Sequence, residues 1–546
     1  MLLRTPPREH TPIRAAAAAV LACALLATGP VPPSEALGAA DRQTTSPSRP
    51  ASAADSREAL QRAAHLVQQG HLEEAEAQAR LALSNPETRG AAHSVLGAIR
   101  FQQERLDESA SLLQEAIRLE PRLIGANLTL AEVRIAQGQP ELAVGLFRRA
   151  LELDPMNPTA RFGLARGEAE KGHFQASLEL ARPVIEAFKL FPEGLFVLAT
   201  CFLKTGDRPA AIALVDHWNR STDIPQAWSI RLAVVYAEEG VPAAAIRILE
   251  QAKTVAPVTY ELAFNLAGAY LLNGEPAPAL DAYDEALRLK PDSLAALRQA
   301  AGVAEGERAL ERSLSYWMRA RKISPDDPEI LLGFGRVCLK MDLLEDAEPA
   351  LTRAASLKPD DIPYQYTLAA VKVGRRQFES AQALLEPLVA RWPADPQLNY
   401  ALGSVLYIQG RLAEAAERLK ESARLNPDQL ASHYYLALVA RDQGNDKEAI
   451  ERLEMLLRRH PEHAPSHEVL GGLLMGAQRY PEAETLLREA VRLNASSAKA
   501  NYQLGLLLAR MGKKDEAEKQ LAHAKQLREE DEATSRLQLR LLEPDR

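Results

Sequence analysis

The chain has 546 residues, of which 47% are hydrophobic, 25% are charged and only 5% are aromatic, and its formal net charge at pH 7 is −8. This composition is ordinary for a water-soluble protein. Its mildly acidic balance argues against proteins that bind nucleic acid or an anionic membrane through a basic surface.

The amino terminus has the order of features found in export signals. Three arginines, an apolar run over residues 15–28 and the small residues Ala36 and Gly38 follow one another. The apolar run is too short to span a bilayer. The sequence therefore predicts a signal peptide over residues 1–38, cleaved near Gly38, a location in the periplasm or cell envelope, and no transmembrane segment in the mature chain.

Two alternatives to this signal peptide remain open, and the first is that the terminus is a helix or a disordered tail. Cys23 follows Val20, Leu21 and Ala22, and this order permits an exported lipoprotein anchored at Cys23, although the apolar run continues past the cysteine. After the predicted cleavage site, residues 39–55 are rich in Ser, Thr and Pro and are expected to form a linker.

From Gly70 onward the sequence repeats every 34 residues without an insertion or deletion. We call the residue that each 34-residue step reaches a landing position. Five residues after each landing position the residue is always Ala or Ser, and seven residues before it the residue is always Ala or Gly. A period of this length is typical of stacked repeats, and it divides residues 56–531 into fourteen units. The landing positions are Gly70, Glu104, Gly138, Gly172, Gly206, Gly240, Gly274, Arg308, Asp342, Arg376, Gly410, Gly444, Gln478 and Gly512.

Each unit is expected to be a helix, a turn and a second helix. Glycine at the landing position accepts a positive φ and ends the first helix, and the small residues allow the two helices to cross closely. Leu stands eight residues before most landing positions, which provides the apolar stripe of the first helix. Proline recurs seventeen residues after the turn, where it separates one unit from the next.

The unit length, the small residues, the glycine turn and the closing proline resemble the tetratricopeptide repeat. This resemblance implies an all-α fold, an α-solenoid superhelix of about fourteen 34-residue helix-turn-helix repeats. Residues 532–546, which carry charge and several leucines, are expected to form a C-terminal capping helix or tail. Gly302 and Gly306 lie inside one first helix and make the unit 294–327 the expected weak point of the array.

The sequence contains no phosphate-binding loop, no paired-cysteine zinc motif and no nucleophile elbow. We therefore predict a protein without catalysis, cofactor or metal. The one cluster that permits an alternative is His460, His463 and His467, with His433 one repeat earlier, since His463 and His467 could share a helical face as metal ligands do. Two prolines favour a solvated turn between repeats at this place.

A second stripe of each first helix carries the candidate binding residues. It consists of the residues thirteen, ten, six and three before the turn, and we call it the groove stripe. In tetratricopeptide arrays, which this chain resembles, it lines the concave surface. Aromatic residues hold the site ten before the turn in seven units, far above a 5% background, and the alternative is that these rings pack between neighbouring first helices. The predicted binding residues are Phe162, Phe196, Phe264, Arg298, Arg336, Lys340, Tyr366, Tyr400, Tyr407, Tyr434, Arg441 and Tyr502.

These features predict a non-catalytic scaffold in the cell envelope that holds a protein or peptide segment in its groove. Tyrosine suits extended peptides and also sugars, so a glycan is a second ligand class. The first alternative is a periplasmic component of polysaccharide secretion or assembly, and the second is a metal enzyme at the histidine cluster. No lysine stands ten residues before a turn, which argues against an adaptor for the carboxyl-terminal tails of chaperones.

Overall fold

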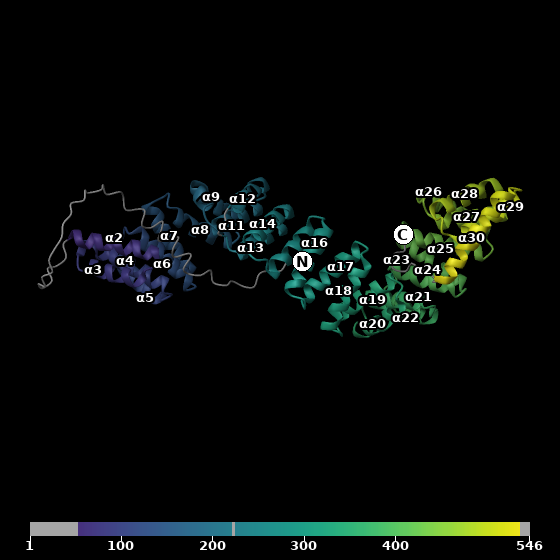
Figure 1. Ribbon diagram of the computed structural model, residues 1–546, viewed down its shortest axis with the longest axis horizontal. Helices are drawn as coiled ribbons and strands as arrows, with labels where there is room; N and C mark the ends of the chain where they lie inside the picture. The colour runs from purple at the N-terminus through teal and green to yellow at the C-terminus, as the bar shows by residue number, and fades with distance from the viewer. Residues whose placement is uncertain (1–52, 221–223, 535–546) are drawn as a thin grey trace. The chain divides into compact units, whose positions relative to one another are not determined.

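The computed structural model describes residues 53–220 and 224–534 (Figure 1). These residues form helices and turns, and no strand occurs among them. The predicted signal peptide, nearly all of the linker and residues 535–546 lie outside the described residues. The chain divides into two compact units, Met1–Pro291 and Asp292–Arg546, and each is treated by itself below.

The described residues of the first compact unit form seven helical hairpins in chain order. Their first helices are α2 (Ala53–Gln69), α4 (Pro86–Gln102), α6 (Ile124–Ala136), α8 (Pro158–Glu170), α11 (Pro192–Lys204), α13 (Gln226–Glu238) and α15 (Tyr260–Leu272). Their second helices are α3 (Leu72–Ala82), α5 (Leu106–Leu119), α7 (Pro140–Leu153), α9 (Phe174–Ala181) with η1 (Arg182–Val184) and α10 (Ile185–Phe188), α12 (Arg208–Arg220), α14 (Pro242–Val255) and α16 (Pro276–Leu289).

The second compact unit contains seven further hairpins. Their first helices are α17 (Leu294–Gly306), α19 (Pro328–Lys340), α21 (Ile362–Gly374), α23 (Pro396–Ile408), α25 (Leu430–Asp442), α27 (Ala464–Gly476) and α29 (Ala498–Arg510). Their second helices are α18 (Leu310–Ile323), α20 (Leu344–Leu357), α22 (Phe378–Arg391), α24 (Leu412–Leu425), α26 (Asp446–Arg459), α28 (Tyr480–Leu493) and α30 (Lys514–Thr534). The predicted all-α fold built from fourteen helix-turn-helix repeats is therefore confirmed.

Each hairpin turns at the residue on which the 34-residue step lands. The nine glycines there have φ between 74° and 84°. The five other residues at these positions, which include Glu104 and Arg376, adopt φ between 59° and 62°. The residue after the turn then closes the first helix, as when Arg411 N–H donates to the Leu406 carbonyl at 3.0 Å. Position in the repeat therefore imposes the left-handed turn even where the side chain disfavours it.

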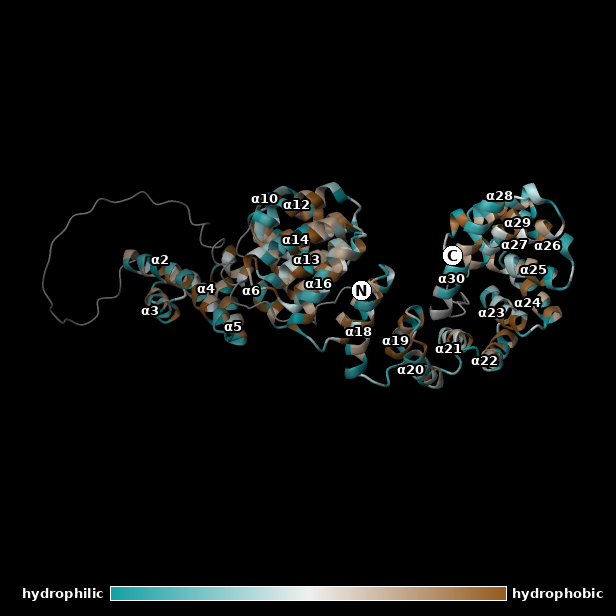
Figure 2. Cartoon of the chain, turned by 45° about the vertical axis from the view of Figure 1, so that its right-hand side comes forward, coloured by the Kyte–Doolittle hydropathy of each residue, from teal (hydrophilic) through white to brown (hydrophobic). Residues whose placement is uncertain are grey.

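The small residues on either side of the turn let the two helices of a hairpin approach. A Cβ atom placed on Gly335 would lie 2.4 Å from Cγ of Leu351 in the second helix. Where the residue five after the turn is Ser, its hydroxyl donates a hydrogen bond to the backbone of the first helix. Ser109 Oγ, for example, donates to the Gly97 carbonyl at 2.7 Å. In Figure 2 most helices show both hydrophobic and hydrophilic residues, as amphipathic helices packed in layers should.

Most second helices have 14 residues, and α9 and α30 depart furthest from this length. Pro183 follows α9, where the chain forms η1 and then the short α10. Phe188 is buried at the end of α10, and its carbonyl oxygen would lie 2.2 Å from a Cβ placed on Gly194 in α11. At the other extreme, α30 has 21 residues and packs its first turns against α29, where Leu521 contacts Gly505.

Candidate functional site

Three of the predicted groove aromatics are enclosed in the core. Phe264, Tyr366 and Tyr400 are only 2%, 8% and 1% exposed. The Tyr366 hydroxyl accepts a hydrogen bond at 2.8 Å from Gln397 on the next first helix. For these three residues the alternative applies, and the rings pack between neighbouring first helices, because adjacent first helices cover the site ten residues before the turn there. Tyr366, Tyr400 and Tyr434 hold this site in three consecutive units, but they present no continuous row of exposed rings.

Two other predicted aromatics of the first compact unit, Phe162 and Phe196, remain partly exposed. Phe162 makes an edge-to-face contact with Phe191, with ring centroids 4.9 Å apart. On the next first helix, Phe196 meets Trp228 at 5.5 Å, and the Arg231 guanidinium lies 4.4 Å from the Trp228 ring centroid. These cation–π and edge contacts join neighbouring first helices and leave part of each ring at the surface.

Three of the four predicted cations are held in ion pairs with neighbouring first helices. Arg336 donates two hydrogen bonds to the Glu305 carboxylate at 2.7 and 2.6 Å, and Lys340 lies 3.2 Å from the same group. Arg298 pairs with Glu329. Because Glu305 is buried and hydrogen-bonded to its partners, these cations connect α17 to α19. A ligand carboxylate would have to compete with Glu305 for them.

Two other predicted residues, Tyr407 and Arg441, meet Asp442 between α23 and α25. The Tyr407 hydroxyl donates to Asp442 Oδ2 at 2.7 Å and accepts from Arg441 Nη2 at 3.3 Å. Arg441 Nε donates to Asp442 Oδ1 at 2.7 Å. Burial and the hydrogen bond to Asp442 raise the pKa of Tyr407, so its hydroxyl stays protonated at neutral pH. The arrangement orients Arg441 beside a tyrosine ring with part of its side chain at the surface.

Aromatic rings extend this cluster along α25. Tyr435 lies at the centre, with ring centroids 5.9, 5.5 and 5.9 Å from those of Tyr400, Tyr407 and Tyr434. Tyr434 in turn contacts the His463 ring at 5.2 Å. We did not predict Tyr435, Asp442 or His463 as binding residues, because they lie one residue off the groove stripe or outside the helix. The pair of consecutive tyrosines was the available signal for Tyr435.

The groove stripe continues onto α27 and α29. Glu468 lies ten residues before its turn and accepts a hydrogen bond at 2.9 Å from Ser497, and it pairs with Lys499 at 2.7 Å. One turn further along α29, Tyr502 is 53% exposed, the most exposed of the predicted rings. We define the tyrosine patch as Tyr407, Tyr434, Arg441, Glu468 and Tyr502, which combines aromatic surface, one cation and one carboxylate.

The histidine cluster has a structural role in the turns between repeats. The His433 ring nitrogen Nε2 lies 2.9 Å from the Pro427 carbonyl, and His467 Nε2 lies 2.7 Å from the Pro461 carbonyl. Asn399 donates to the Pro393 carbonyl in the same register at 2.8 Å. Within residues 53–220 and 224–534, no three His, Cys, Asp or Glu side chains are grouped to hold a metal ion. The His433 and His467 rings therefore provide hydrogen-bond partners for the proline carbonyls in the turns between repeats.

This architecture of stacked helical hairpins defines an α-solenoid repeat protein. A tetratricopeptide repeat model matches residues 55–123, 128–169, 230–293, 366–429 and 468–531, more than half of the chain. A second tetratricopeptide repeat model matches residues 406–471. The chain therefore belongs to the tetratricopeptide repeat family, and it is a protein–protein interaction scaffold of this kind.

The chain is similar to solved structures at low sequence identity. The Cut9–Hcn1 hetero-tetramer of APC/C is 14% identical, with 83% of this chain and 96% of that chain covered and a TM-score of 0.39. A tetratricopeptide repeat protein from Parabacteroides merdae ATCC 43184 is 16% identical, with 46% and 98% covered and a TM-score of 0.39. YrrB, described as having an unusual peptide-binding site, is 19% identical, with 37% and 99% covered and a TM-score of 0.30.

No curated protein matches the chain in sequence at a significant level. Among the helices of the described residues, none has the length and apolar character that crossing a bilayer requires.

Proposed function

We propose that this scaffold holds an extended segment of a partner protein against the groove stripe, and that the tyrosine patch is the main contact in the second compact unit. The observation that carries the proposal is the convergence of Tyr407, Tyr434 and Arg441, which were predicted separately from their register. Their aromatic surface and hydrogen-bonding groups suit a peptide, because rings supply contact area and the polar groups can pair with a peptide backbone.

The chemistry of the patch favours a peptide over an anionic ligand. Arg441 and Lys499 are balanced by Asp442 and Glu468, so no excess of positive charge remains at the patch. At the edge of a bound segment, the Glu468 carboxylate can accept hydrogen bonds and the partly exposed Arg441 guanidinium can donate them. The expected ligand is therefore a segment of mixed polarity with at least one large apolar side chain.

The experiment is affinity capture from a cell-envelope extract, followed by affinity measurements on the captured protein. We expect the double variant Arg441→Ala, Tyr502→Ala to bind at least about tenfold more weakly, since anchors of these types often contribute 2 kcal/mol or more. Met455→Ala is the matched control, because Met455 is exposed on the second helix α26, outside the groove stripe. Equal affinities for the double variant and the wild-type chain would contradict the proposed contact.

We further propose that the protein works in the cell envelope after export. The support is the order of charged, apolar and small residues within residues 1–38. Mass spectrometry of the mature amino terminus should find a chain that begins near Gly38, or one that begins with a lipid-modified Cys23 if the lipoprotein alternative holds. A cell-associated chain that keeps Met1 in the cytoplasm would rule out export.

A further inference from the structure

One patch on the second helices departs from the chemistry of the other repeats. Each junction between repeats contains a residue ten after the turn and a residue just before the next turn. At every other junction at least one of the two is polar or charged, as with Thr352 and Arg375. At the junction of α18 with α19 both are methionine, Met318 and Met341, and Met318 is 48% exposed.

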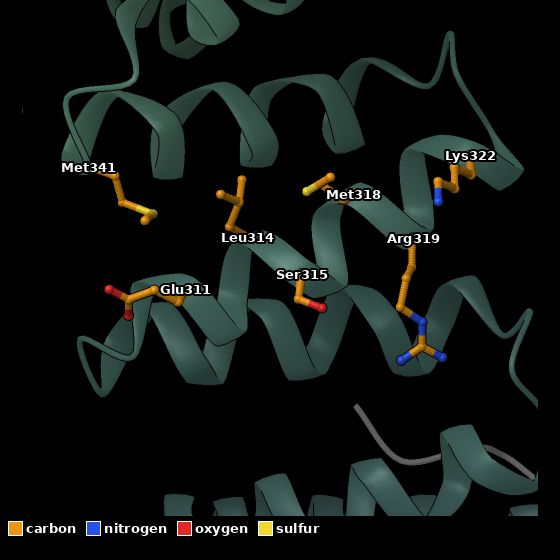
Figure 3. Close-up of a pocket in the computed structure, with 7 residues that line it drawn as sticks. All are labelled: Glu311, Leu314, Ser315, Met318, Arg319, Lys322 and Met341. Carbon is orange, nitrogen blue, oxygen red and sulfur yellow. The ribbon is translucent and has the colours of Figure 1, made fainter.

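These methionines line a shallow depression of about 280 Å³, which we call the methionine depression. Figure 3 shows Leu314, Met318 and Met341 pointing into the space between two helices, with Lys322 at one end and Glu311 at the other. Leu314, Met318 and Lys322 lie on one stripe of α18. The eleven residue-to-residue steps from Glu311 to Lys322 correspond to about 16 Å of helix.

Polar side chains occupy the corresponding place at other junctions between repeats. Glu348 on α20 pairs with Lys372 and, at 2.8 Å, with Arg375. The Tyr270 hydroxyl donates to Glu250 at 2.9 Å across another junction. At the methionine depression, apolar atoms take the place of such a pair and remain open to solvent. A cluster of exposed apolar groups of this kind marks an interaction site more often than a single exposed side chain does.

We propose that the methionine depression docks an amphipathic helical segment of a partner protein, with an aliphatic side chain in the depression and acidic residues facing Lys322. Its volume lies below the range of about 300 to 1,000 Å³ typical of small-molecule sites, so it suits one or two protein side chains. Methionine adapts its shape to such side chains. This site lies on a second helix, so it is separate from the tyrosine patch.

Charge complementarity selects the acidic partner and its direction. Neither Lys322 nor Glu311 forms an ion pair with any residue in the described parts of the chain, and both are exposed. A partner helix that lies along α18 would place its acidic residues beside Lys322 and a basic residue beside Glu311.

The test uses the full chain and a panel of labelled helical peptides of about four turns. One peptide carries leucines four residues apart and glutamates at one end, the second has lysine for glutamate, and the third has serine for leucine. Met318→Glu and Lys322→Glu are the test variants, and Glu386→Lys is the matched control, because glutamate at Glu386 shows that this register accepts charge. Fluorescence anisotropy measures each dissociation constant.

We expect the acidic leucine peptide to bind the wild-type chain most tightly and to lose roughly tenfold in affinity on Met318→Glu. Lys322→Glu should weaken the acidic peptide and strengthen the basic one, whereas Glu386→Lys should change neither. Absence of saturable binding, equal binding of the serine peptide or insensitivity to Met318→Glu would overturn the proposal. Self-association of the chain that Met318→Glu abolishes would assign the depression to a second copy and would also overturn it.

Discussion

Tyr400→Ala is expected to lower the free energy of unfolding by about 3 to 5 kcal/mol, a change typical of removing a buried aromatic ring. The ring is 1% exposed and lies in one cluster with Leu402 and Val405. It also meets Tyr435 of the next first helix at 5.9 Å. Its loss leaves a cavity between two repeats that rigid helices cannot close.

Tyr502→Ala is the matched control, because Tyr502 occupies the same register of α29 but is largely exposed. We expect this substitution to change stability by less than about 1 kcal/mol. Hydrogen exchange along α23 and α29 should measure both effects, since repeat arrays need not unfold in one step. Equal destabilisation by the two substitutions would show that register, not burial, determines the role of these rings.

Gly335→Ala is expected to destabilise the second compact unit by about 1 to 3 kcal/mol. The added methyl group would lie 2.4 Å from Leu351 Cγ and 3.0 Å from its Cδ1, so α19 and α20 would have to separate. The unfolding midpoint in urea, followed by circular dichroism, measures this change.

Gly302→Ala provides the contrast within the second compact unit. A Cβ atom on Gly302 meets no atom within 4 Å, and the residue lies in the interior of α17. Alanine should therefore raise stability by up to about 1 kcal/mol through helix propensity alone. If Gly335→Ala proves neutral, or if Gly302→Ala is as damaging, close helix crossing is not the reason for the small residues. A stabilising Gly302→Ala would also support the expectation that the unit 294–327 is the weak point.

Much of the fold could be predicted from the sequence because every repeat has the same length. The period identified the turn at Arg376 as well as at Gly410, although arginine carries no local signal for positive φ. The interruption after α9 could not be predicted in this way. Pro183 and Pro387 occupy the same register, yet α22 continues through Pro387. The difference lies in packing, since buried Phe188 brings the backbone against Gly194 only in the first case.

The register of the candidate site residues could be predicted from the sequence, but the burial of their side chains could not. The spacing that places Tyr366 and Tyr502 on one stripe does not say how closely the neighbouring first helix covers each ring. The ion pairs could have been predicted from the sequence, because partners on adjacent first helices lie about one period apart. Arg336 and Glu305, for example, are 31 residues apart. The predicted ligand-binding roles of Arg298, Arg336 and Lys340 did not take these carboxylates into account.

The most direct test of the scaffold is photo-crosslinking from the groove stripe. A photoreactive amino acid in place of Tyr502 should crosslink the captured partner, and the same group in place of Met455 should not, because Met455 is exposed on a second helix. Mass spectrometry of the crosslinked peptides identifies the bound segment. Crosslinking from Met455 alone, or equally from both positions, would contradict binding at the groove stripe.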